Sequence, residues 1–167
     1  MDVSVGDQFE ILARLLLAAL LGAFIGLERE LRGYPAGIRT IALVTMGACL
    51  FTDVSQLVGA GDRIAAQIVT GIGFIGAGLI FREGEGVKGI TTAATIWAAA
   101  AIGMAIGIEL YVVAIAGSGI IFALLWSRPV THRIEEILRP HEGALRSSFD
   151  NMVSGEKVTD EEKRTDD

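Results

Sequence analysis

Six charged residues lie inside or at the edges of apolar stretches, where ionisable side chains are costly and usually functional. They are Glu28, Arg29, Glu30, Arg39, Asp53 and Arg82. Carboxylates and guanidinium groups from neighbouring connectors can form an ion-pair network, and a carboxylate within a membrane can hold a cation or a proton. The alternative is a set of solvated charges that only mark the membrane boundary. The sequence leaves both interpretations open.

Asp53 lies about fifteen residues into the apolar stretch that begins at Ile38. An unpaired carboxylate at that depth costs about 1 to 3 kcal/mol, and less near the interface. It could serve as a cation or proton handle that faces the outer leaflet. Its polar neighbours, Thr52 and Ser55, favour instead an interfacial residue at the point where a helix meets water. Arg14, in the first apolar stretch, can pair with Glu10 four positions earlier.

The sequence offers little support for a catalytic, cofactor or metal site. Residues 71–76 fit the spacing GxGxxG, but that fingerprint requires a preceding strand and an acidic residue about 20 positions later. Cys49 has no neighbouring histidine to activate it as a nucleophile. His132 and His141 are far from other metal ligands. We therefore expect no enzyme, no cofactor and no bound metal, and an enzyme with an intramembrane site is the weakest alternative.

The elements that position these charges must be membrane helices. The chain is 51% hydrophobic with a mean hydropathy of +0.53, and apolar stretches near the ~20 residues needed to cross a bilayer recur through the first 127 positions. We expect an all-α, polytopic bundle of five transmembrane helices in residues 1–127. Their approximate bounds are 9–27, 38–58, 64–81, 91–107 and 110–127.

The remaining positions, 128–167, predict a short cytoplasmic tail. Residues 128–149 can form an amphipathic segment at the membrane surface, and the composition after Asp150 is that of an acidic, disordered tail. The net charge of −6 and the pI of about 4.9 make nucleic acid an unsuitable partner.

Glycine is unusually dense in two of the predicted helices. Gly22 and Gly26 stand four apart in the first helix, and residues 71–78 read GIGFIGAG. In water each glycine would cost a helix about 1 kcal/mol, whereas in a bilayer small residues let neighbouring backbones approach closely. We expect the second run to be the central packing strip of the bundle, through Gly71, Gly73, Gly76 and Gly78. Such strips can also pack on another membrane protein or on a second copy of the chain.

Basic residues gather in alternate connectors. Arg29, Arg32 and Arg39 surround the first connector and Arg82 and Lys88 the third, whereas the other side has only Arg14 and Arg63 near its ends. The positive-inside rule then predicts an N-terminus outside and a C-terminus in the cytoplasm.

Several segments, taken in order, carry a family resemblance. They are GLERE at 26–30, AGIRT at 36–40, AAQIV at 65–69, GIGFIGAG at 71–78 and TTAAT at 91–95. Together they resemble the MgtC/SapB family of bacterial membrane proteins. The resemblance implies a multi-pass protein of the bacterial inner membrane, linked to growth in low magnesium, acid tolerance and survival inside host cells. It also implies that the charges at 28–30 are signature positions, and that members are closer to regulators of other membrane machines than to pumps.

We therefore expect a non-enzymatic regulator or scaffold whose partners are the lipid bilayer and another membrane protein or a second copy. The alternative is a magnesium, proton or other cation transporter that uses Asp53, Glu28 and Arg39. Few charges lie within the apolar stretches, and no inverted repeat is visible, which disfavours the transporter.

Overall fold

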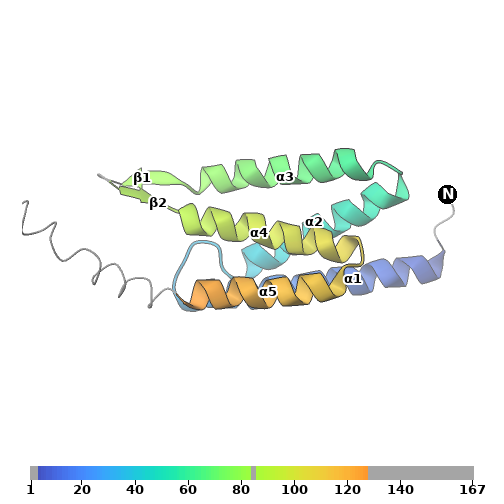
Figure 1. The fold of residues 1–167 in the computed structure, drawn as a ribbon, viewed down its shortest axis with the longest axis horizontal. Coiled ribbons are helices and arrows are strands. Elements are labelled where there is room, and N and C mark those ends of the chain that lie inside the picture. Colours follow the sequence, from blue (N-terminus) through green and yellow to red (C-terminus); the bar gives the residue numbers. More distant parts are fainter. Residues whose placement is uncertain (1–3, 84–85, 128–167) are drawn as a thin grey trace, which may run out of the picture. The chain divides into compact units, whose positions relative to one another are not determined.

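The computed structural model describes residues 4–83 and 86–127, which form five helices and one short hairpin (Figure 1). The helices are α1 (Val5–Leu31), α2 (Ile38–Leu57), α3 (Gly61–Gly78), α4 (Ile90–Gly107) and α5 (Tyr111–Trp126). Between α3 and α4, β1 (Phe81–Glu83) pairs antiparallel with β2 (Gly86–Lys88). The expected all-α bundle is confirmed, with this hairpin as an addition. The predicted amphipathic segment and acidic tail lie outside the described residues.

Consecutive helices run in opposite directions, so their ends gather at two places. One end, which we name the hairpin end, holds the α1–α2 connector, the β1–β2 hairpin and the last turn of α5. The other, which we name the turn end, holds the start of α1 and the α2–α3 and α4–α5 turns (Figure 1). Three helices, α1, α2 and α4, are long and apolar enough to cross a membrane, while α3 and α5 are apolar but shorter.

Helix ends differ from the sequence expectation where local hydrogen bonds decide them. Ser4 caps α1 through its side chain, which accepts from the Asp7 N–H, and the Asp7 carboxylate accepts from the Ser4 N–H in return. This capping box starts α1 four residues earlier than expected. At the other end, α1 continues to Leu31 instead of stopping near residue 27. The charges at 28 and 29 stay helical because they are buried against other helices.

The third helix has the expected length but lies three residues earlier, since it begins at Gly61 and ends at Gly78, and Phe81 belongs to β1. The N–H groups of Leu79 and Ile80 bond to carbonyls three residues back, which closes the last turn. Directly after β2, Gly89 has a φ of 92° and packs against the Leu79 carbonyl. Only glycine fits both the positive φ and this close approach, so the hairpin leads directly into α4.

The helix at the centre of the bundle is α4, because it contacts each of the other four helices. Ten of its 18 residues are buried. In α3, by contrast, only Ile68 and Gly76 are buried among the residues whose side chains are described. Figure 1 shows α3 along one edge of the bundle. An all-round apolar sequence of Ala, Gly and Ile suits α4 to contacts on every side.

The structure therefore differs from the expectation that residues 71–78 are the central packing strip. A Cβ placed on Gly71, Gly73 or Gly78 would meet no atom within 4 Å, and one on Gly76 would make only ordinary contact with Ala93. The dense glycines lie on the edge helix, which turns most of its surface away from the bundle. The density of glycines in the sequence indicated close packing between helices, but it did not show which helix face makes the contact.

The tight contacts of the bundle are made by glycines of α1 and α4 on the two sides of α2. A Cβ on Gly22 would lie 2.6 Å from the Thr45 hydroxyl, and one on Gly26 would lie 2.7 Å from Cα of Ile38. From the opposite side, Gly103 packs on the Thr45 carbonyl. Since no side chain separates these backbones, α2 is held between two helices at close range.

Candidate functional site at the two ends of the bundle

A cluster of charges lies inside the hairpin end, and we name it the Glu28 cluster: Glu28, Arg29, Arg32 and Thr92. The side chains of Glu28 and Arg29 are both only 1% exposed. They remain helical at the end of α1, and both are buried there. Charged groups this deeply buried require partners, since an isolated buried charge is very costly.

The contacts of Arg29 tie α1 to α4. Its Nη2 donates a 2.7 Å hydrogen bond to the Thr92 hydroxyl, and its guanidinium lies 3.6 Å from the centroid of the Tyr34 ring. Cation–π stacking and a charge-assisted hydrogen bond together fix the plane of the group. Thr92 was not among the expected site residues, because nothing in its local sequence indicates a partner 63 positions away.

The contacts of Arg32 tie the same cluster to α5. Its Nε lies 2.8 Å from Glu28 Oε1, while its Nη2 donates to the Trp126 carbonyl oxygen at 3.2 Å. Arg29 Nη1 is 3.9 Å from the other Glu28 oxygen. Neither Glu28 oxygen accepts a hydrogen bond of good geometry from a described residue. Glu28 thus acts chiefly as a buried negative charge between two guanidinium groups.

The other three charges of the hairpin end are arranged differently from the network expected for them. Glu30 accepts a 3.0 Å hydrogen bond from the Ile38 N–H, so it stabilises the first turn of α2. Arg39 is exposed and forms no ion pair with a described residue. Arg82 is also exposed, on β1. The structure brings Glu28 and Arg29 together, and it leaves Arg39 out of the cluster.

A second cluster lies at the turn end, and we name it the Arg14 cluster: Glu10, Arg14, Asp53 and Glu109. Arg14 Nη1 donates to Asp53 Oδ1 at 2.7 Å, and its Nη2 lies 3.2 Å from Glu109 and 3.7 Å from Glu10. One guanidinium thus joins α1, α2 and the α4–α5 turn, where Glu109 has a φ of 65°. Beside it lies a cavity of about 370 Å³ that Glu10, Arg14, Glu109 and Tyr111 help to line.

The environment of Asp53 differs from the interfacial position favoured for it. Its side chain is 3% exposed and pairs with Arg14, so it is not an interfacial residue in water. One oxygen accepts from Arg14, and the other accepts a 3.6 Å contact from the Cys49 thiol. The predicted Glu10–Arg14 pair is present, but Arg14 lies closer to Asp53. In the described part of the chain, no group of three or more His, Cys, Asp or Glu side chains could hold a metal ion.

Between the two clusters the interior is mainly apolar, with a few buried hydroxyls. Ile25, Ile41, Ile96 and Ile106 are fully buried there, together with small residues such as Ala99. The hydroxyls of Thr45, Thr52 and Ser118 donate to carbonyls of their own helices. Such bonds satisfy a hydroxyl within its helix, so they need no polar partner across the bundle.

Comparison with known proteins matches residues 15–134 of this chain to the model of the MgtC family. The chain belongs to the MgtC family. It is 46% identical over 143 residues to protein MgtC of Salmonella typhimurium, a match that covers 83% of this chain and 62% of the relative. No solved structure matches this MgtC-family chain.

Two further MgtC-family relatives cover shorter stretches. YhiD of Escherichia coli K12, whose name provisionally calls it a magnesium transporter, is 48% identical over 121 residues, covering 65% of this chain and 56% of YhiD. Protein MgtC of Brucella abortus is 54% identical over 94 residues, covering 54% of this chain and 39% of that protein. The chain therefore spans less than two thirds of the length of these relatives. Family membership and the apolar helices make it a membrane protein.

Proposed function

We propose that this protein is a non-enzymatic regulator or scaffold of other membrane machinery in the bacterial inner membrane, acting in adaptation to low magnesium or acid. The observation that carries the proposal is the apolar, close-packed interior between the two charge clusters. Transporters place polar or ionisable groups near the midplane, often on broken helices. Between the two clusters this chain has buried isoleucines, glycines packed on α2, and hydroxyls bonded within their own helices.

The charges that join helices support the same proposal. Arg29 and Arg14 are each bound to groups on other helices, so they stabilise the positions of those helices. A rigid bundle with exposed apolar faces on α3 and α5 can present fixed surfaces to another membrane protein. In this proposal the N-terminus lies outside and the C-terminus in the cytoplasm, because the hairpin end carries Arg32, Arg39, Arg82 and Lys88.

The alternative function is transport of magnesium, protons or another cation. One observation favours it: the Arg14–Asp53 pair lies beside the cavity at the turn end, and carboxylate–guanidinium pairs recur on ion pathways. The name of the YhiD relative points the same way. Asp53 would then be the group that binds the ion, and the apolar interior would have to open for passage.

Two measurements on the same variants separate these functions. Purified protein in liposomes is tested for ion flux with magnesium and pH reporters. In a second measurement, the gene is tested for its ability to restore growth of a deletion strain in low magnesium. We expect the native chain to support growth and to produce no flux. Flux that depends on the protein and falls in Asp53→Asn would establish the transporter instead. Growth that does not depend on the gene would refute the link to magnesium.

A further inference from the structure

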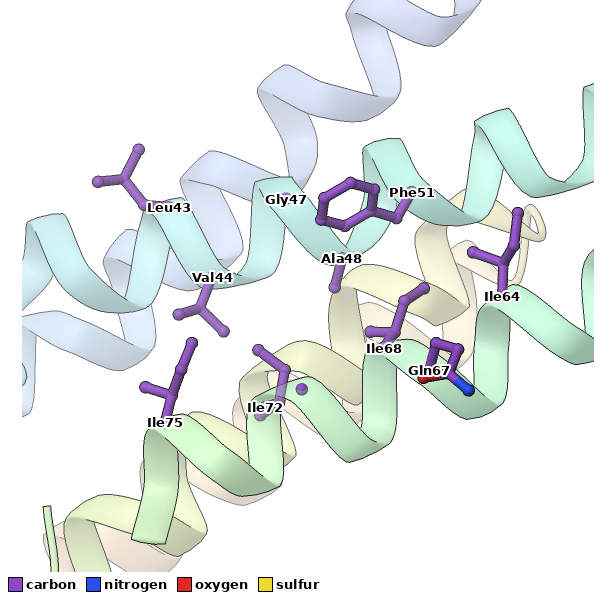
Figure 2. A pocket seen from close by; sticks show the side chains of 11 residues that line it. Leu43, Val44, Gly47, Ala48, Phe51, Ile64, Gln67, Ile68, Ile72 and Ile75 are labelled. Atoms are coloured by element: carbon purple, nitrogen blue, oxygen red, sulfur yellow. The ribbon is translucent and has the colours of Figure 1, made fainter. Parts of the chain in front are cut away.

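An apolar groove of about 520 Å³ lies between α2 and α3 (Figure 2). Leu43, Gly47 and Phe51 belong to its α2 wall, and Ile68, Gly71 and Ile75 belong to its α3 wall. The exposed side chains of Leu43, Phe51 and Ile75 show that the groove opens to the outside of the bundle, where lipid surrounds a membrane protein. Gln67 is the one polar residue among those that line it.

Two glycines create the width of this groove. A Cβ on Gly47 or on Gly71 would meet no atom within 4 Å, unlike one on Gly22 or Gly103. These two glycines are therefore not needed for packing between helices of the same chain. Their missing side chains leave space in the groove, whose volume is in the range of small-molecule sites.

A positive charge marks one end of the groove. Arg39, Leu43, Gly47 and Phe51 follow one another at four-residue steps, so they share one face of α2. Arg39 lies at the hairpin end, is exposed, and forms no ion pair with a described residue. Arg82 on β1 follows the α3 wall at the same end. The groove thus has an apolar body, and two exposed arginines follow its walls toward the hairpin end without lining it.

We propose that this groove binds an anionic phospholipid, with an acyl chain between α2 and α3 and the phosphate at Arg39 and Arg82. The twelve helical steps from Arg39 to Phe51 span about 18 Å of helix, somewhat more than half of the ~30 Å hydrocarbon core. Basic groups between membrane helices bind anionic lipid headgroups. This binding site does not depend on the proposed regulatory function.

Charge favours this occupant over a second copy of the chain. A two-fold axis along the membrane normal would place both copies of Arg39 and Arg82 at the same depth, where like charges repel. An anionic lipid supplies the missing counter-charge together with an apolar chain of suitable length. An unrelated transmembrane helix would match only if it carried a carboxylate at the same depth.

The test is native mass spectrometry of the full chain in detergent, equilibrated with phosphatidylglycerol or with phosphatidylcholine. Gly47→Leu and Gly71→Leu fill the groove, and we expect each to lower bound phosphatidylglycerol at least fivefold. Gly119→Leu is the matched control, because a Cβ at that α5 position also has no neighbour within 4 Å. It should retain the native amount of lipid.

The charge is tested separately. Arg39→Gln combined with Arg82→Gln should abolish the preference for phosphatidylglycerol over phosphatidylcholine, whereas Arg63→Gln, an exposed arginine at the turn end, should preserve it. These exposed substitutions do not fill the groove, so they test the site even if a leucine variant misfolds. Equal lipid binding by folded groove-filled and native protein would overturn the proposal. Unchanged lipid binding together with a loss of dimers in the Gly47→Leu and Gly71→Leu variants would also overturn it. That result would show that the groove joins two copies.

Discussion

Asp53 of α2 and Arg14 of α1 are joined by a 2.7 Å ion pair although 39 positions separate them in the sequence. Glu109, in the turn between α4 and α5, lies 3.2 Å from the same guanidinium. One arginine at the turn end therefore links α1, α2 and the α4–α5 turn. The Glu28 cluster plays the corresponding role at the hairpin end, where Arg29 and Arg32 reach α4 and α5.

Replacing Asp53 with asparagine should weaken the bundle, because the partly buried Arg14 loses its closest negative partner. Hydrogen bonds to charged groups contribute about 1.5 to 3 kcal/mol, and we expect a loss in this range. Thermal unfolding in detergent, followed by circular dichroism, measures it. Glu10→Gln is the control, since Glu10 is 73% exposed and should change stability by no more than about 0.5 kcal/mol. Equal effects of the two substitutions would contradict the importance of the Asp53 pair.

Adding a methyl group to Gly103 should destabilise the protein, because it would collide with the Thr45 carbonyl of α2. Overpacking of this kind costs about 1 to 3 kcal/mol. The same change at Gly73 should be neutral or stabilising, since its Cβ would be free of neighbours and alanine favours helix. Melting temperatures of Gly103→Ala and Gly73→Ala compare the two. A larger loss of melting temperature in Gly73→Ala than in Gly103→Ala would show that α3, and not α4, is the packing centre.

Glu28 should be energetically coupled to Arg32 and not to Arg39. The first pair lies 2.8 Å apart, while Arg39 forms no ion pair with a described residue. In double-mutant cycles with glutamine substitutions, residues in contact show interaction energies of about 0.5 to 3 kcal/mol. We expect such a value for Glu28 with Arg32 and additive effects for Glu28 with Arg39. Coupling to Arg39 alone would refute the observed arrangement of the cluster.

The proposed orientation places Val58 outside the cell and Leu31 in the cytoplasm, and both side chains are well exposed. Single cysteines at these positions can be labelled with a membrane-impermeant maleimide in a Cys49→Ser background, because Cys49 is buried. We expect Val58→Cys to react in intact spheroplasts and Leu31→Cys to react only after permeabilisation. The reverse labelling pattern would show that the protein has the opposite orientation in the membrane.

The helices could be predicted from the sequence because their signals are local. Apolar stretches of suitable length, with glycine and proline between them, placed α2 at Ile38 where the structure has it. The helix ends moved where side chains or turns formed specific bonds, as at Ser4 and Leu79. The β1–β2 hairpin was missed because three-residue strands carry almost no periodicity.

The candidate site could be predicted only in part, because its contacts are not local. Glu28 and Arg29 stood out as charges beside an apolar stretch, and the four-residue spacing of Glu28 and Arg32 is compatible with an ion pair. The partners of Arg29 and Asp53 on other helices depend on how the bundle packs. The same limit explains the misplaced packing strip, since glycine density does not reveal which face of α3 meets a neighbour.

The unequal lengths of the helices have a consequence for the surrounding bilayer. The 27 residues of α1 extend about 40 Å, whereas the 16 residues of α5 extend about 24 Å. The hydrocarbon core measures about 30 Å, so α5 is too short to match it and α1 is longer than required. A bilayer accommodates so short a helix by thinning locally or by letting flanking side chains reach its interface. Because α1 is longer than the same hydrocarbon core, two helices of this protein present opposite mismatches to the lipid around them.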